Sequence, residues 1–167
     1  GGESEVLEAH PDQVVAKLQV RATNEVGVLF DAIADKDFLA FPLEAIASSA
    51  SYKGAAGELI ATTTDVLTQG QLDFSQLEAR LLRGEQSNTS VVYGDQFILK
   101  LFRKVEEGIN PDLEIGRFLT EKKLLEHFAP VAGALEYRIQ GSQPTTLGIL
   151  QGFVADTRDA WSYTIDS

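Results

Sequence analysis

One lysine lies in an otherwise apolar run that has the composition of a β-strand. Lys100 is the only charged residue between Phe97 and Phe102. An unpaired ammonium group in a dry core is strongly unfavourable, so Lys100 requires either solvent or an anion. Side chains alternate along a strand, which places Lys100 on the same face as Ile98 and Phe102. Because both faces of this strand are apolar, we expect it to be central in its sheet.

The next predicted element is a helix that carries acids able to pair with Lys100. Asn110 suits the N-cap and Pro111 the first helical position, and acids in the first turn complement the helix dipole. The predicted apolar stripe of this helix consists of Ile115, Phe118 and Leu119. Glu114 is one turn from Phe118, so we expect it to border the stripe and look toward the sheet. Glu121 lies two turns later and is the alternative partner for Lys100.

Each of these residues also has a simpler interpretation. Lys100 could extend along apolar surface and place its ammonium group in water. Glu114 could be an ordinary first-turn acid that stabilises its helix by about 0.3–1 kcal/mol. The residues alone leave both alternatives open.

Several segments resemble the bacterial maltokinases, including those fused behind trehalose synthase. The resemblance is strongest over the second half of the chain and is carried by SNTSVVYGDQFILKLFR (87–103), NPDLEIGRFLTE (110–121), GALEYR (133–138), TTLGILQGFV (145–154) and DAWSYT (159–164). Before Gly84 the chain is similar to the amino-terminal cap of that family in layout more than in motif.

The resemblance implies an ATP-dependent kinase that phosphorylates maltose at its anomeric hydroxyl, giving maltose 1-phosphate between trehalose and α-glucan (glycogen) synthesis. It implies a strand lysine, Lys100, that holds ATP phosphates and pairs with Glu114. The catalytic aspartate, the Mg²⁺ ligands and the maltose pocket belong to the family's carboxy-terminal lobe. We therefore expect those groups outside this chain, and we expect the chain alone to be inactive.

Two further segments are implied to contact ATP. The segment from Gly84 to Ser90 has the position of the loop that covers the phosphates. It has one glycine where protein kinases have several, but backbone N–H groups and polar side chains can still donate to phosphate. The nucleotide contacts predicted there are Ser87, Asn88, Thr89 and Ser90, and those in the hinge strand are Gln151 and Phe153. A plain polar hairpin turn and a plain core strand are the alternatives.

Composition limits the classes of partner. The net charge of −11 repels phosphate backbones, which argues against nucleic acid. No apolar run approaches the roughly 20 residues needed to span a bilayer, so we expect no membrane partner. The absence of cysteine excludes disulfides and thiolate metal sites, and nothing favours an oxidising compartment. We expect a cytoplasmic protein.

The predicted fold is α+β, with an amino-terminal cap subdomain at residues 1–83. A protein-kinase-like (aminoglycoside-phosphotransferase-like) small β-sheet lobe follows at 84–155, and 156–167 form the hinge and the start of a carboxy-terminal lobe missing from this chain. The chain has no methionine and starts Gly-Gly, so we expect a piece of a longer protein. A rival hypothesis is an interaction or regulatory module whose acidic cap docks trehalose synthase or another protomer.

Overall fold

The structure is a computed structural model that describes residues 8, 11–68, 73–82, 87–122 and 128–154. The chain divides into two compact units, Gly1–Phe41 and Pro42–Ser167. The two units are described in turn.

The first unit contains a β-hairpin. Strands β1 (Val14–Gln19) and β2 (Val26–Phe30) form a two-stranded antiparallel sheet, as the sequence predicts. Short 3-10 turns at Pro11–Gln13 and Ala32–Ala34 flank the hairpin. Asn24 has a φ of 61°, a conformation that asparagine tolerates better than most residues, which fits its place between the strands.

Helix α2 (Lys36–Ala47) contains the division between the two units. Pro42 lies in the middle of α2, beyond the first turn where a helix tolerates proline best. Proline lacks an N–H, so the carbonyl of Phe38 has no partner four residues later. Leu43, Ala45 and Ile46 are all buried, and this packing keeps the helix intact past the proline.

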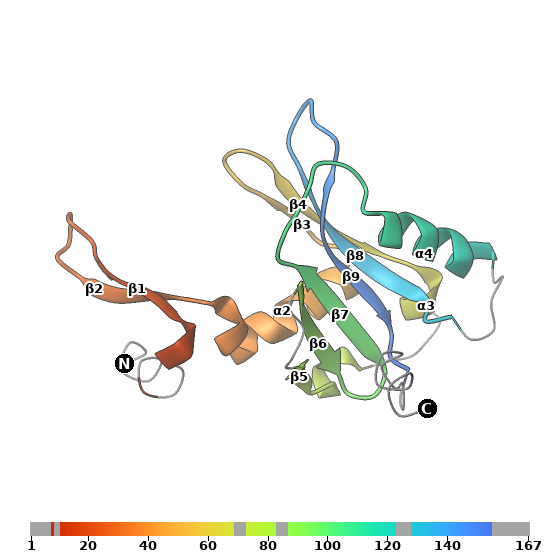
Figure 1. The fold of residues 1–167 in the computed structure, drawn as a ribbon, viewed down its shortest axis with the longest axis horizontal. Helices are drawn as coiled ribbons and strands as arrows, with labels where there is room; N and C mark the ends of the chain where they lie inside the picture. Colours follow the sequence, from red (N-terminus) through yellow and green to blue (C-terminus); the bar gives the residue numbers. More distant parts are fainter. Residues whose placement is uncertain (1–7, 9–10, 69–72, 83–86, 123–127, 155–167) are drawn as a thin grey trace, which may run out of the picture. The chain divides into compact units, whose positions relative to one another are not determined.

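The second unit is built on one seven-stranded antiparallel sheet with the order β3-β4-β8-β9-β7-β6-β5 (Figure 1). Strand β7 lies between β9 and β6, which confirms that the lysine strand is central. The strands are β3 (Ser51–Lys53), β4 (Glu58–Thr63), β5 (Ala79–Leu82), β6 (Asn88–Tyr93), β7 (Phe97–Phe102), β8 (Val131–Arg138) and β9 (Thr145–Gly152).

Helix α4 (Pro111–Lys122) covers one face of the sheet and lies beside β8 (Figure 1). Its Leu113 packs in a buried cluster with side chains from three strands, which are Val131, Ala134, Ile149 and Phe102. The opposite face approaches α2, since a Cβ atom added at Gly133 would overlap the side chain of Ile46. The sheet therefore has a helix on each face.

The sheet includes strands from residues that the sequence analysis assigned to the cap. Strand β4 pairs with β8 along its whole length, and β5 pairs with β6. A short helix, α3 (Asp65–Thr68), follows β4. The sheet thus contains strands from both sides of the expected boundary at residue 83. The division into cap, lobe and hinge stays a prediction.

Candidate functional site

Lys100 lies on the sheet face that α4 covers. In the antiparallel register it is directly opposite Ser90 of β6 and Ile149 of β9, and residues opposite each other point to the same face. Ile149 belongs to the cluster around Leu113, which fixes this face as the α4 face. The Lys100 side chain is half-buried. The strand and helix predicted to act together therefore meet on one side of the sheet.

The register divides the other predicted nucleotide contacts between the two faces. Asn88 is opposite Phe102 and Gln151 is opposite Ile98, so both share the face of Lys100 and Ser90. Thr89 is on the other face, where its hydroxyl accepts a hydrogen bond of 3.1 Å from the Arg103 side chain. The structure thus brings Asn88, Ser90, Lys100 and Gln151 to one face and leaves Thr89 on the other.

The loop before β6 is shorter than the sequence suggested. The predicted phosphate loop ran to Ser90, but β6 begins at Asn88, so that Asn88, Thr89 and Ser90 are strand residues. Every residue from Asn88 to Tyr93 pairs with a residue of β7, so the chain from Asn88 onward belongs to the sheet and not to the loop. Ser87 is exposed just before the strand, and Gly84 lies outside the described residues.

Phe153 follows the end of β9 in the position of the predicted hinge. Its backbone N–H donates a hydrogen bond of 2.8 Å to the carbonyl of Gln96, which extends the pairing of β9 with β7 by one step. The side chain is half-buried. The chain therefore leaves the sheet next to the turn that joins β6 to β7.

The face of α4 that packs on the sheet is not the one expected from its apolar residues. Ile115 and Phe118 are 57% and 53% exposed, whereas Leu113 and Gly116 are buried. Gly116 explains the orientation, because a Cβ there would lie 2.6 Å from Val131 Cγ2 and only glycine allows this close approach. The prediction that the apolar stripe of Ile115, Phe118 and Leu119 marks the face packed on the sheet was wrong.

The orientation of α4 on the sheet also decides where its acidic side chains lie. Glu114 and Glu121 are both exposed. The ion pairs among the described residues join Lys104 to Glu106 and Arg117 to Glu136, and neither includes Lys100. The pairing of Lys100 with Glu114 or Glu121 stays a prediction for the ATP-bound state.

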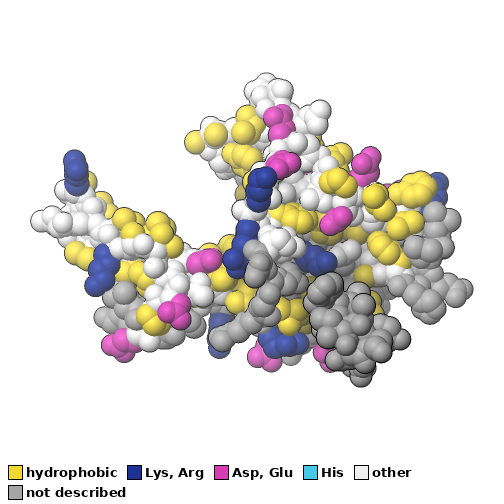
Figure 2. Space-filling model, in the orientation of Figure 1, with side chains coloured by type: hydrophobic (Ala, Val, Ile, Leu, Met, Phe, Trp, Pro, Cys, Tyr) yellow, Lys and Arg dark blue, Asp and Glu magenta, His cyan; other side chains and the backbone are white. Residues whose placement is uncertain are grey.

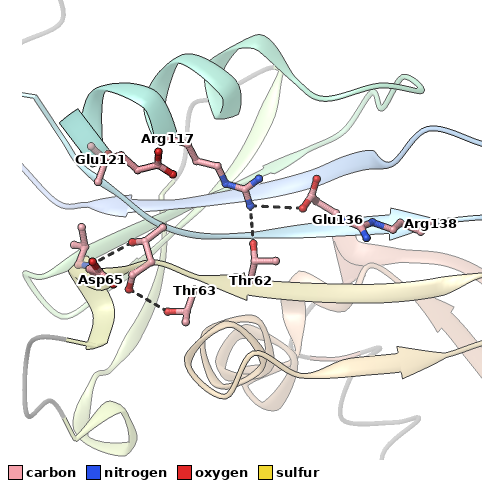
Figure 3. Close-up of a pocket in the computed structure, with 10 residues that line it drawn as sticks. Thr62, Thr63, Asp65, Arg117, Glu121, Glu136 and Arg138 are labelled. Atoms are coloured by element: carbon pink, nitrogen blue, oxygen red, sulfur yellow. Dashed lines mark hydrogen bonds and ion pairs between the residues drawn. The ribbon is translucent and has the colours of Figure 1, made fainter. Parts of the chain in front are cut away.

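Sequence reasoning missed an anchor between α4 and the sheet (Figure 3). The Arg117 guanidinium lies 3.5 Å from the Glu136 carboxylate on β8 and donates a 2.6 Å hydrogen bond to the Thr62 hydroxyl on β4. The Thr120 hydroxyl accepts a 2.8 Å bond from the N–H of Val131. The one clue in the sequence was Glu136, an acid inside the apolar run of β8.

A cavity of about 580 Å³ opens beside this anchor, between α4, β4, β8 and the start of α3. Its walls are polar and apolar in about equal measure, and they are formed by Thr62, Thr63, Thr64, Asp65, Val66, Arg117, Thr120, Glu121, Glu136 and Arg138. Glu121, the alternative partner of Lys100, lines this cavity.

Within the described residues there is no group of three or more histidines and carboxylates arranged to hold a metal ion. The described residues therefore do not form a complete set of Mg²⁺ ligands. No helix in this part of the chain is both long and apolar enough to cross a membrane.

The fold is similar to part of two solved kinase structures. No protein-family model matches the chain. A solved structure of glucosamine kinase in complex with glucosamine, ADP and inorganic phosphate is similar, with a TM-score of 0.51 at 16% identity over 90% of this chain. A second crystal form of glucosamine kinase gives a TM-score of 0.51 at 14% identity over 98% of this chain.

The chain spans 31% and 41% of the length of those two glucosamine kinase chains. At such low identity the likeness concerns the fold alone. The likeness supports a kinase-like fold and does not identify the acceptor sugar.

Proposed function

We propose that this chain is the amino-terminal, ATP-binding part of a maltokinase, which transfers phosphate from ATP to the anomeric hydroxyl of maltose. In this proposal the larger carboxy-terminal lobe supplies the catalytic aspartate, the Mg²⁺ ligands and the maltose pocket. The chain alone binds nucleotide and does not transfer phosphate.

The observation that carries the proposal is the position of Lys100. It is a half-buried lysine in the middle of a kinase-like sheet, on the face covered by α4, and no ion pair joins it to another described residue. A lysine in this position acts as a point charge for phosphate oxygens. A phosphate group there would stabilise its ammonium group, which otherwise depends on contact with solvent.

The polar side chains around Lys100 agree with a phosphate group on the same face. Asn88 lies two residues from Ser90 on β6, and both point to the side of Lys100. An asparagine amide can donate to phosphate oxygens, as can backbone N–H groups at the start of a strand. Gln151 and Phe153, at the end of β9, are the proposed contacts to the adenine.

The acceptor is tested on the longer protein that contains this chain. The protein is incubated with ATP and Mg²⁺ and with maltose, glucose or glucosamine in parallel, and the products are identified by ³¹P NMR. We expect maltose 1-phosphate as the main product. Faster phosphorylation of glucosamine or glucose would show that the kinase assignment holds and the maltose assignment does not.

A second candidate function is an interaction module, favoured by the exposed apolar side chains of the β1–β2 hairpin (Figure 2, yellow). The exposed large apolar residues of this hairpin and its flanks are Val15, Leu18, Val20, Val26 and Leu29. Isolated two-stranded hairpins are only marginally stable in water, so a covering surface would stabilise this one. Analytical ultracentrifugation with trehalose synthase and with the chain alone separates the two functions. An interaction module would form a complex with trehalose synthase or with a second copy of the chain, and ATP would not change that complex.

A further inference from the structure

The cavity beside the Arg117–Glu136 anchor lies apart from the residues proposed to bind ATP. It is formed over β4 and β8, whereas Lys100 is on β7, and β9 lies between β8 and β7 in the sheet. Of the residues considered for the nucleotide site, only Glu121, the alternative partner of Lys100, lines it. Its volume of about 580 Å³ is typical of sites for small molecules.

Part of the polar lining is fully used by the fold. The Thr120 hydroxyl donates to the Gly116 carbonyl and accepts from the Val131 N–H. The Thr64 hydroxyl donates to the Val131 carbonyl at 2.7 Å and lies 3.4 Å from the N–H of Val66. These two threonines hold the walls in place and are not available to a ligand.

The remaining polar groups include both donors and acceptors. Arg117 has five N–H donors, of which the contacts to Thr62 and Glu136 use the Nη2 group. Glu136 meets Arg117 through Oε2, and its second oxygen is not used in that contact (Figure 3). Asp65, Glu121 and Arg138 add two carboxylates and a second guanidinium to the walls.

The charged pair in the wall itself points to a ligand. Glu136 is 3% exposed, and the cost of desolvating a buried ion pair makes it a poor way to stabilise a fold. An apolar pair of similar volume would hold α4 to the sheet equally well. A fixed guanidinium next to a fixed carboxylate does, however, supply a donor and an acceptor at defined positions.

The lining also selects against other ligands. Its three carboxylates exceed its two guanidiniums, which disfavours a phosphate or another anion. Although Val66 is the one apolar residue in the lining, apolar atoms form about half of the walls, so they suit a ligand that combines polar groups with apolar C–H surface. Adjacent hydroxyl groups on a ligand can donate hydrogen bonds to the carboxylates and accept them from the guanidiniums, so they pair with both kinds of charged group in the walls.

We propose that this cavity binds a neutral mono- or disaccharide through Arg117, Glu136, Asp65 and Glu121. The site does not depend on ATP binding at Lys100, and it would be present even if the chain had no part in phosphate transfer. Because Arg117 is on α4, an occupying sugar would also brace the helix against β4 and β8.

The test is a titration of the 167-residue chain with maltose and with glucose, followed by amide NMR and by calorimetry. We expect saturable shifts at Thr63, Asp65 and Arg117. The Glu121→Gln and Asp65→Asn variants should each raise the Kd by about tenfold or more, because each weakens a charged acceptor of the sugar hydroxyls. Both positions are at the cavity rim, and thermal melting confirms that the variants are folded.

The matched control is Asp112→Asn, which removes one negative charge from an exposed residue of α4 that does not line the cavity. It should leave the Kd unchanged. Absence of saturable binding by both sugars would overturn the proposal. So would sugar binding that the Glu121→Gln and Asp65→Asn variants leave intact, or binding of inorganic phosphate or glucosamine in preference to the neutral sugars.

Discussion

Two cations on the α4 side of the sheet, Lys100 and Arg117, have different environments. Arg117 has a carboxylate at 3.5 Å and a hydroxyl at 2.6 Å, and it connects a helix to two strands. Lys100 has no ion pair with a described residue and is half-buried on a central strand. Arg117 therefore contributes to the fold, whereas Lys100 is the residue that we propose to bind an anion.

We predict that Arg117→Leu lowers the free energy of unfolding by about 1–3 kcal/mol, because Glu136 loses its counter-charge while staying buried. The Arg117→Leu, Glu136→Leu double variant should regain most of this loss, since apolar pairs of similar volume can replace buried ion pairs. Urea unfolding measures both variants.

The control for this prediction is Lys104→Ala, which breaks the Lys104–Glu106 pair between two exposed side chains. Exposed pairs add little stability, so unfolding should be unchanged. A single Arg117→Leu variant as stable as the unmodified chain would contradict the anchor.

Tyr93 gives the chain a pH dependence at the alkaline end. Burial raises the pKa of its hydroxyl, so the folded state keeps this proton at a pH where the unfolded chain has lost it. Above the unfolded value of about 10 the unfolded state binds fewer protons, and stability must fall as the pH rises. Below that value this group leaves stability independent of pH.

We predict that Tyr93→Phe flattens the fall in unfolding free energy above pH about 10, because the variant lacks the buried ionisable hydroxyl. Tyr52→Phe, at an exposed tyrosine, is the control and should keep the original slope. Urea titrations at several alkaline pH values measure the slope. Equal slopes for Tyr93→Phe and the unmodified chain would refute the burial argument.

At the scale of elements, the sequence predicted the Lys100 strand and the helix that follows it because the signals for both are local. Gly94 has a φ of 55° in the turn between β6 and β7, and the side chain of Asn110 caps α4 by accepting a 2.9 Å bond from the N–H of Asp112. The buried face of α4 was not predicted, because Ile115 and Phe118 are apolar but exposed. That face depends on the contact of Gly116 with a strand that follows it in the chain.

We predict that glycine substitutions at the two helix–sheet contacts destabilise the fold in a defined order. Gly133→Ala should cost more than Gly116→Ala, since its Cβ would lie 2.5 Å from the backbone carbonyl oxygen of Thr62, while the Gly116 Cβ meets a side-chain methyl. Overpacking of this kind costs about 1–3 kcal/mol, and alanine's higher helix propensity offsets part of it at Gly116.

Thermal unfolding ranks these variants, with Gly54→Ala as the control. The Cβ of that variant would have an ordinary contact of 3.4 Å. A variant at Gly133 that is as stable as the one at Gly54 would show that α2 and β4 do not pack on β8 as described.

At the scale of the whole molecule, the kinase-like fold agrees with the sequence, but the extent of the sheet does not follow from local patterns. Strand β4 joins the sheet through β8, more than 60 positions later in the chain for every residue pair in their register, and Thr62 and Arg117 meet across 55 positions. No local alternation or cap predicts such contacts. For the same reason the cavity beside the anchor could not be found in the sequence.

The most direct test of the account is calorimetric titration of the chain with ATP, comparing Lys100→Ala with Lys104→Ala. Both variants lose one positive charge, but only Lys100 is on the proposed phosphate face. We predict that Lys100→Ala weakens ATP binding by about tenfold or more, that Lys100→Arg restores it only partly, and that Lys104→Ala leaves it unchanged. Equal ATP affinity of the unmodified chain and a folded Lys100→Ala variant would contradict the central claim.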